Sequence, residues 1–385
     1  MNKKRHSAQK SPGDEPQLEF DDEGIEPEIV SSGDSITQPF DPTLIRVEPR
    51  AFTVDLLLSR IRKNEIELSP AFQRHDGIWS DTAQSRLIES LLIRIPLPAF
   101  YMDATDDDKW IVVDGLQRLS TLRRFIIEQQ LTLRDLEFLS PLQGKTYDKL
   151  PRSFQRRILE TTLTLFLIQS GTPPEVKFNI FKRINTGGLP LSAQEIRHAL
   201  NQGKVTDFLK ELADCKEFRR ATAKGISPKR MGDRECALRF LAFTLTDPKD
   251  YKAGDFDAFL NDCMSRVNRL PTSELNNLTR DFKRALHTAE ACFAEYAFRK
   301  RYSMHPEYRS PINKALFEAW TVNLSKLDDD ENARLIKRKE QLQLESCRLM
   351  NDRGFEEAVS QGTGDIRKVR IRFQRVSDTI RKVLS

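Results

Sequence analysis

Residues 110–122 read WIVVDGLQRLSTL and join two kinds of secondary structure within one short segment. The first four residues are apolar, as in a buried strand, and Asp114-Gly115 precedes a helical pattern with Leu119 and Leu122 on one face. A strand that leads directly into a helix brings unpaired backbone N–H groups and the positive end of the helix dipole to one point. Such a point favours an anion, typically a phosphate. The segment therefore predicts a mixed α/β fold with an anion site at its strand-to-helix turn.

The side chains at this turn have chemistry that suits a phosphate. Gln117 and Arg118 fall in the first helical turn, where an amide and a guanidinium can grip phosphate oxygens. Asp114 can hold a divalent metal or orient a water molecule. Two structural alternatives stay open, since Asp before a helix is a common N-cap and Arg118 can instead pair with a carboxylate beneath the sheet.

Periodic apolar residues extend the α/β pattern on both sides of the turn. Thr53 and Ser80 are suited to cap helices, and Ser192 with Glu195 forms a capping-box pattern. Short strands are expected near residues 66–68, 99–102, 110–113 and 162–168, and a helix is expected from Pro174 to Gly187-Gly188. A further helix is expected to open at Pro311 and to carry Ile312. Beyond about residue 205 only helical periods remain, with a long seam from Leu275 to Tyr296 and another from Ile366 to Val383.

The composition of the N-terminal residues differs from that of the rest of the chain. Its 385 residues carry a net charge of +5, but residues 1–42 hold four basic and ten acidic residues and lack any apolar period. We expect residues 1–42 to be a disordered acidic tail, residues 43–205 to form the mixed α/β domain, and residues 206–385 to form an all-α helical domain. The five cysteines are odd in number and widely spaced, which argues against a disulfide framework or a zinc cluster.

Two other segments carry chemically informative residues. Residues 66–74 read IELSPAFQR and are followed by Trp79, whereas residues 181–192 read FKRINTGGLPLS. The second segment is typical of a helix stop, yet its small residues also allow a backbone to approach a ligand closely. Asn185 and Thr186 offer hydrogen-bonding groups for a base, sugar or phosphate.

In this order and spacing, the three segments closely resemble the N-terminal domain of GmrSD-type modification-dependent restriction systems, a member of the ParB/sulfiredoxin-like superfamily. The resemblance covers about residues 45–205. It implies a ParB-like α+β fold and nucleoside triphosphate binding and hydrolysis coupled to DNA restriction. Asp114, Gly115, Gln117 and Arg118 match the DGQQR motif of that family, whereas Leu116 replaces its first Gln.

The resemblance also implies a set of site residues. Asp114, Gln117 and Arg118 are the expected catalytic residues, with Asp114 as the Mg²⁺ ligand. The expected nucleotide-binding residues are Phe72, Gln73, Arg74, Gly115, Ser120, Asn185, Thr186 and Gly187. The cofactors would be Mg²⁺ and an NTP, and the sequence does not distinguish ATP, GTP and CTP. Many relatives add a His-Asn-His nuclease motif, which is not found here, because His287 and His305 lack suitable partners nearby.

Basic residues in the last helix indicate DNA as a partner. The expected DNA-binding residues are Arg367, Lys368, Arg370, Arg372 and Arg375, although solvated helix faces give the same pattern. The expected protein is a cytoplasmic NTP hydrolase of a prokaryotic restriction or anti-phage defence system, without membrane association. Other expected partners are a separately encoded nuclease or ATPase subunit, and a homo-oligomer stays open. Two alternatives are a non-catalytic DNA-binding adaptor and an autonomous ParB-like DNA endonuclease.

Overall fold

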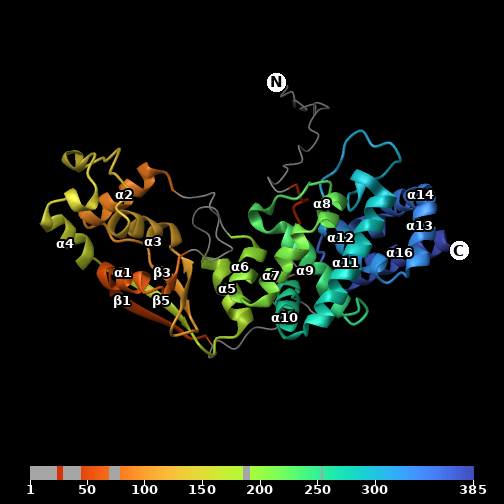
Figure 1. The fold of residues 1–385 in the computed structure, drawn as a ribbon, viewed down its shortest axis with the longest axis horizontal. Coiled ribbons are helices and arrows are strands. Elements are labelled where there is room, and N and C mark those ends of the chain that lie inside the picture. Colours follow the sequence, from red (N-terminus) through yellow and green to blue (C-terminus); the bar gives the residue numbers. More distant parts are fainter. Residues whose placement is uncertain (1–23, 29–44, 69–78, 185–190, 253–254) are drawn as a thin grey trace, which may run out of the picture.

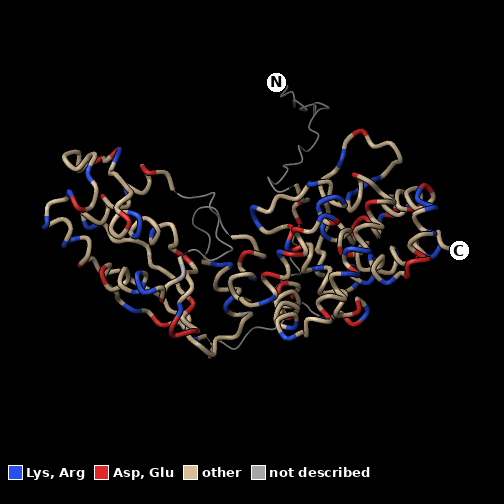
Figure 2. The backbone as a smooth tube through the Cα atoms, in the orientation of Figure 1, with Lys and Arg blue, Asp and Glu red and all other residues tan. Residues whose placement is uncertain are grey.

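The computed structural model describes residues 24–28, 45–68, 79–184, 191–252 and 255–385. A mixed α/β lobe precedes an all-helical lobe, as the sequence predicts, and helices α5 and α6 lie between the two lobes (Figure 1). Figure 2 shows Lys and Arg mixed with Asp and Glu over both lobes. The net charge therefore does not separate into one basic and one acidic side.

A five-stranded sheet with the order β1-β5-β3-β4-β2 organises the first lobe. β3 is the central strand, parallel to β5 and antiparallel to β4, whereas the outer strand β1 is antiparallel to β5. The strands are β1 (Val47–Thr53), β2 (Ile66–Glu67), β3 (Phe100–Ala104), β4 (Trp110–Asp114) and β5 (Thr162–Gln169). β1 is not expected from the sequence, because its residues other than Phe52 are at least partly exposed and its pairing with β5 is long-range.

Helices cover both faces of this sheet. They are α1 (Val54–Arg62), α2 (Asp81–Leu92), α3 (Leu116–Leu122), α4 (Arg152–Glu160), α5 (Pro174–Ile184) and α6 (Ala193–Leu200), and α3 continues into a π-helical turn (Arg123–Ile127). One face packs Phe100 and Met102 into the main core with α1 to α3. The opposite face packs Val113 and Ile168 against Phe178 and Phe181 of α5. Thr53, Ser80 and Ser192 cap α1, α2 and α6 as predicted.

The second lobe is a bundle of helices around one large apolar core. Its helices are α7 (Lys204–Asp214), α8 (Lys216–Ala221), α9 (Gly232–Leu245), α10 (Phe256–Arg269), α11 (Thr272–Phe293), α12 (Lys314–Ser325), α13 (Asp329–Lys337), α14 (Lys339–Met350), α15 (Arg353–Ser360) and α16 (Ile366–Leu384). Both predicted seams are buried, through Phe282 and Leu286 on α11 and through Val369 and Val376 on α16. The proposed boundary near residue 205 stays a prediction, because α6 contacts both α5 and α9.

Two details of the second lobe correct the sequence expectations. The helix expected at Pro311 begins at Lys314, since Asn313 accepts a hydrogen bond from the Leu316 N–H and acts as the N-cap. Ile312 therefore lies outside the helix and forms isolated β-bridges with Ile25 and Arg299. Ile25 is itself buried, so residues 24–28 are ordered against the helical lobe rather than disordered.

Two further features are the hydropathy of the helices and the state of the cysteines. Within the described ranges, no helix is long and apolar enough to cross a membrane. Cys236, Cys263, Cys292 and Cys347 are buried free thiols, and Cys215 is half-buried.

Candidate functional site

The turn between β4 and α3 is built around Gly115, the N-cap residue of α3. Gly115 has a φ of 99°, a left-handed conformation that favours glycine. A Cβ at this position would lie 2.3 Å from Cδ1 of Phe100, so a larger residue does not fit. Gly115 supplies no side-chain cap, and among the described residues no side chain accepts from the first-turn N–H groups. The Asp114 side chain is therefore not the N-cap.

Asp114 instead pairs with Arg118, one helical turn later. Nη2 of Arg118 donates to Oδ2 of Asp114 at 2.7 Å, and the Asp114 side chain is 30% exposed. Nη2 also donates to the carbonyl of Ala99 at 3.2 Å, and Nη1 donates to the carbonyl of Pro98. The guanidinium lies over the Phe100 ring, 4.3 Å from its centroid. Burial lowers the pKa of Arg118, while Asp114 opposes that shift.

These contacts change the expected role of Arg118. Both terminal nitrogens already donate to protein oxygens, so the guanidinium orients the Asp114 carboxylate and fixes the start of β3. A direct contact of Arg118 with a phosphate stays a prediction, since three of its five N–H donors are used in these bonds. Asp114 keeps a partly exposed carboxylate at the end of β4, beside the start of α3.

Gln117 connects the β4–α3 turn to Trp79, just before α2. Its Oε1 accepts a hydrogen bond from the backbone N–H of Trp79 at 3.2 Å. The carbonyl of Trp79 accepts from Nε2 of Gln84 at 2.6 Å, so the Trp79 backbone is held on both sides. Trp79, which follows residues 66–74 in the sequence, thus contacts the β4–α3 turn through this hydrogen bond.

The other predicted residues fall in two groups. Ser120 is half-buried on α3, and Leu116 is half-buried and packs against the main core of the first lobe. Phe72, Gln73, Arg74, Asn185, Thr186 and Gly187 lie outside the described residues. Helix α5, which precedes Asn185 in the sequence, contacts β4 through Val113 and Phe181.

A polar cluster on the α5 face of the sheet is not anticipated from the sequence. Nζ of Lys177 donates to Oδ2 of Asp103 at 3.0 Å and to Oγ1 of Thr105, and the side chains of Lys177 and Asp103 are about one-tenth exposed. The signal in the sequence is weak, because Asp103 merely follows an apolar run. The pair fastens α5 to β3, one strand away from Asp114.

The described residues offer limited protein ligands for a metal. No group of three or more His, Cys, Asp or Glu side chains gathers there at metal-binding distance. Mg²⁺ commonly uses one or two carboxylates together with phosphate oxygens and water. Asp114 fits that pattern as a single protein ligand.

On α16, the predicted DNA-binding residues have different environments. Arg372 is fully buried and donates to Glu318 from Nε at 2.7 Å, so it is a core residue and not a surface contact. Arg367, Arg370 and Arg375 are exposed, and Lys368 is half-buried. Five cations line a groove between α16 and the α9–α10 loop, namely Lys249, Lys326, Arg370, Arg375 and Arg381, with Asp247 and Asp378 as the acidic lining residues. We call this feature the α16 groove.

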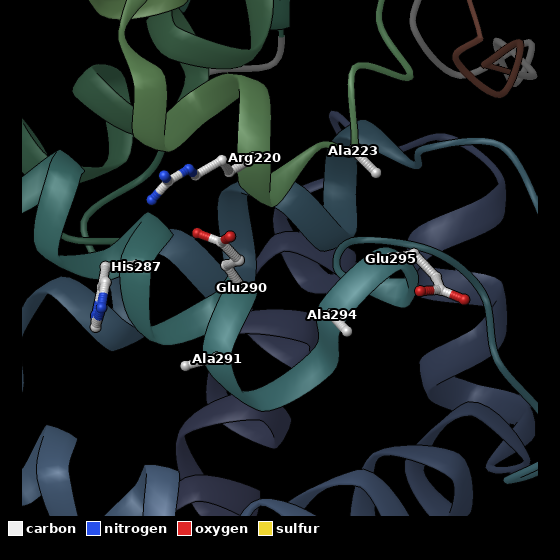
Figure 3. A pocket seen from close by; sticks show the side chains of 7 residues that line it. All are labelled: Arg220, Ala223, His287, Glu290, Ala291, Ala294 and Glu295. Atoms are coloured by element: carbon white, nitrogen blue, oxygen red, sulfur yellow. The ribbon is translucent and has the colours of Figure 1, made fainter.

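The histidines of the helical lobe do not form a catalytic cluster. His287 is exposed on α11 and lines a depression between α8 and α11, in which Arg220 and Glu290 point toward each other (Figure 3). The lining of this depression also includes Glu295 but no second histidine and no cysteine.

Comparison with known proteins finds a family match within the first lobe. Residues 55–201 match the family model described as "GmrSD restriction endonuclease, N-terminal domain". The match covers less than half of the chain and confirms the resemblance inferred from the motifs. No curated protein matches the chain.

Proposed function

We propose that this chain is a component of a restriction-type defence system that acts on DNA, and that its first lobe binds an NTP at the β4–α3 turn. The observation that carries the proposal is that Asp114, Gly115, Gln117 and Arg118 gather at one uncapped helix start, inside the region matching a restriction-endonuclease domain. Backbone N–H groups at such a start favour a phosphate.

Each residue at the turn has a distinct role in this proposal. Gly115 permits the left-handed turn that starts α3, where a Cβ would collide with the buried Phe100 ring. Asp114 is the Mg²⁺ ligand or water-orienting group, and Arg118 is a positioning residue that holds its carboxylate. Mg²⁺ would supply charge neutralisation to the phosphates. Gln117 holds the backbone of Trp79 at the β4–α3 turn, and we propose Phe72, Gln73 and Arg74 as further nucleotide contacts.

We further propose that Asn185, Thr186 and Gly187 contact the nucleotide from the segment after α5. Support comes from the contact of α5 with β4, which brings the end of α5 to the same lobe face as Val113. Ser120 follows Gln117 by three positions on α3 and completes the set.

The residues at the β4–α3 turn support NTP binding more than NTP hydrolysis. Leu116 stands where the family motif has its first Gln, and its side chain packs partly against the apolar core. An apolar side chain cannot orient a water molecule by hydrogen bonding. We therefore propose slow hydrolysis, with NTP binding as the principal property of the site.

The α16 groove is the proposed contact with DNA. Its lining carries five cations and two carboxylates, an excess of three positive charges. Such an excess neutralises phosphates in a salt-dependent manner. This assignment keeps Arg370 and Arg375 from the sequence prediction and adds Lys249, Lys326 and Arg381.

A DNA-binding adaptor without nucleotide chemistry is the second candidate. The engagement of Arg118 by Asp114, Pro98 and Ala99 favours it, because those contacts also suit a purely structural turn. An assay of NTP hydrolysis and plasmid cleavage, with modified and unmodified DNA, separates the candidates. NTP-independent DNA binding with intact plasmid supports the adaptor, and cleavage by the chain alone supports an autonomous endonuclease.

A further inference from the structure

The short segment of residues 24–28 sits on the helical lobe as a peptide would. The Glu26 N–H donates to the carbonyl of Ile312 at 2.8 Å, and the Ile312 N–H donates to the carbonyl of Gly24 at 3.1 Å. Ile25 lies between these bonds and is 4% exposed. Adding one extended strand to another through backbone hydrogen bonds is a common mode of peptide recognition.

Backbone shape restricts which residues fit at the start of this segment. Gly24 has a φ of +71°, and a Cβ there would lie 1.9 Å from the carbonyl oxygen of Gly225. The partner strand also ends directly after Ile312, because Asn313 is the N-cap of α12. The pairing is therefore confined to one bridge, the size of a linear peptide motif.

Glu26 supplies the first charged contact of the segment. Nζ of Lys300 donates to its Oε1 at 2.6 Å, and Nδ2 of Asn313 donates to its Oε2 at 3.0 Å. Asn313 also caps α12. One carboxylate thus engages two different parts of the helical lobe.

Glu28 supplies the second charged contact, two residues further on. Arg239 of α9 donates to both carboxylate oxygens, from Nη1 to Oε1 at 2.8 Å and from Nη2 to Oε2. Oγ1 of Thr363 donates to Oε1 at 2.7 Å. A bidentate guanidinium–carboxylate pair is among the strongest and geometrically most specific hydrogen-bonded contacts in proteins. Burial opposes ionisation of Glu28, yet Arg239 and Lys314 lower its pKa to about 2.

Without Glu28, the buried ion pairs beneath it would contain one more cation than carboxylates. A network of ion pairs links three cations with two carboxylates there, namely Arg239, Lys314 and Arg372 with Glu235 and Glu318. Glu28 provides the third carboxylate. Because an uncompensated buried charge is costly, this surface requires an anion from outside the helical bundle.

We propose that this surface is a docking site for an acidic, extended peptide of the form Ile-Glu-Pro-Glu, filled in cis by residues 25–28, which act as a detachable strap on the helical lobe. The site recognises one apolar residue, Ile25, and two carboxylates two positions apart, Glu26 and Glu28. It involves no residue of the β4–α3 turn, so its failure leaves the proposed nucleotide site untouched, and the reverse also holds.

The test uses the full chain with a protease site inserted between Gly33 and Asp34. After cleavage, we expect the N-terminal fragment to remain bound during size exclusion and to exchange with a fluorescent peptide of residues 20–32. A peptide with Glu28→Lys should compete about 100-fold less well or worse, whereas Pro27→Ala, a change at an exposed position, should compete as the parent peptide does. Loss of the fragment without competitor, or no exchange in excess peptide, would overturn the proposal.

Hydrogen exchange on the uncut chain provides a second measurement if the insertion disturbs folding. Glu28→Lys should reduce protection of the Glu26 and Ile312 amides, whereas Glu48→Lys on exposed β1 should not. Equal protection in both variants contradicts the strap. Mixed dimers formed from two differently tagged chains, with the segment exchanged between them, contradict the assignment in cis.

Discussion

The carboxylate of Asp114 is held by Arg118, which lies one helical turn further on and donates to it at 2.7 Å. The same guanidinium donates to the two carbonyls that precede β3, so the partner of the Asp114 carboxylate is itself fixed in place. Gly115, between them, keeps the backbone free of a side chain. The turn is thus a preformed structure, and its rigidity can be tested separately from its chemistry.

Gly115→Ala should destabilise the first lobe strongly. The new Cβ meets the Phe100 ring at 2.3 Å in a left-handed backbone conformation, so we expect a loss of about 2–4 kcal/mol in urea unfolding. Gly144→Ala is the matched control, since its φ is +75° but no atom lies within 4 Å of the added Cβ, and it should cost about 1 kcal/mol. Equal losses of stability in the two variants would mean that the Phe100 ring moves aside at no free-energy cost.

Leu116→Gln should increase NTP hydrolysis. The substitution restores the amide of the family motif at a half-buried position beside Asp114, where it can orient water. We expect a rise of about tenfold or more in turnover, measured as phosphate release. Leu116→Met is the control of similar size without a hydrogen-bonding group. An equal rise in both variants, or none in Leu116→Gln, contradicts this account of the slow site.

The pair of charge reversals Arg375→Glu and Arg381→Glu should weaken DNA binding. Both side chains are exposed in the α16 groove, and losing two phosphate contacts should lower the slope of log affinity against log salt by about 2. Arg152→Glu and Arg156→Glu on exposed positions of α4 serve as the matched pair. Equal weakening by the two pairs would indicate general charge attraction instead of a groove.

The lowered pKa of His198 should reduce the free energy of unfolding as the pH falls from 6.5 toward 4. Burial and the nearby Arg234 lower its pKa from 6.5 to about 4, while Asp207 opposes this shift, so the unfolded chain binds the proton first. Stability is full above pH 6.5 and falls by up to about 1.4 kcal/mol per pH unit below it. Urea unfolding of His198→Gln should lack this part of the slope, whereas the exposed His287→Gln should retain it.

Local patterns predict much of the first lobe, because caps and apolar periods act over a few residues. Thr53, Ser80 and Ser192 are examples, and each accepts the hydrogen bond expected of it. The long seams of α11 and α16 were equally predictable from their spacing. The turn at Gly115 follows from the same local signals.

Long-range pairing explains what the sequence could not predict. Arg372 looks like one more surface cation of α16, yet its partner Glu318 lies 54 residues earlier, on α12. Strand β1 contains Pro49 and Arg50 and becomes a strand only by pairing with β5. Residues 24–28 have too little apolar surface to predict a buried contact, which depends on Arg239 and Ile312 far along the chain.

The central claim, that an NTP binds at the β4–α3 turn, is tested most directly by calorimetric titration of the full chain with ATP, GTP and CTP in the presence of Mg²⁺. We predict that one of these binds at one site per chain, that Asp114→Asn weakens it at least about tenfold, and that Asp108→Asn, in the exposed β3–β4 turn, leaves it unchanged. Unfolding curves establish that both variants are folded. Absence of binding by all three nucleotides, or unaltered affinity in Asp114→Asn, would contradict the claim.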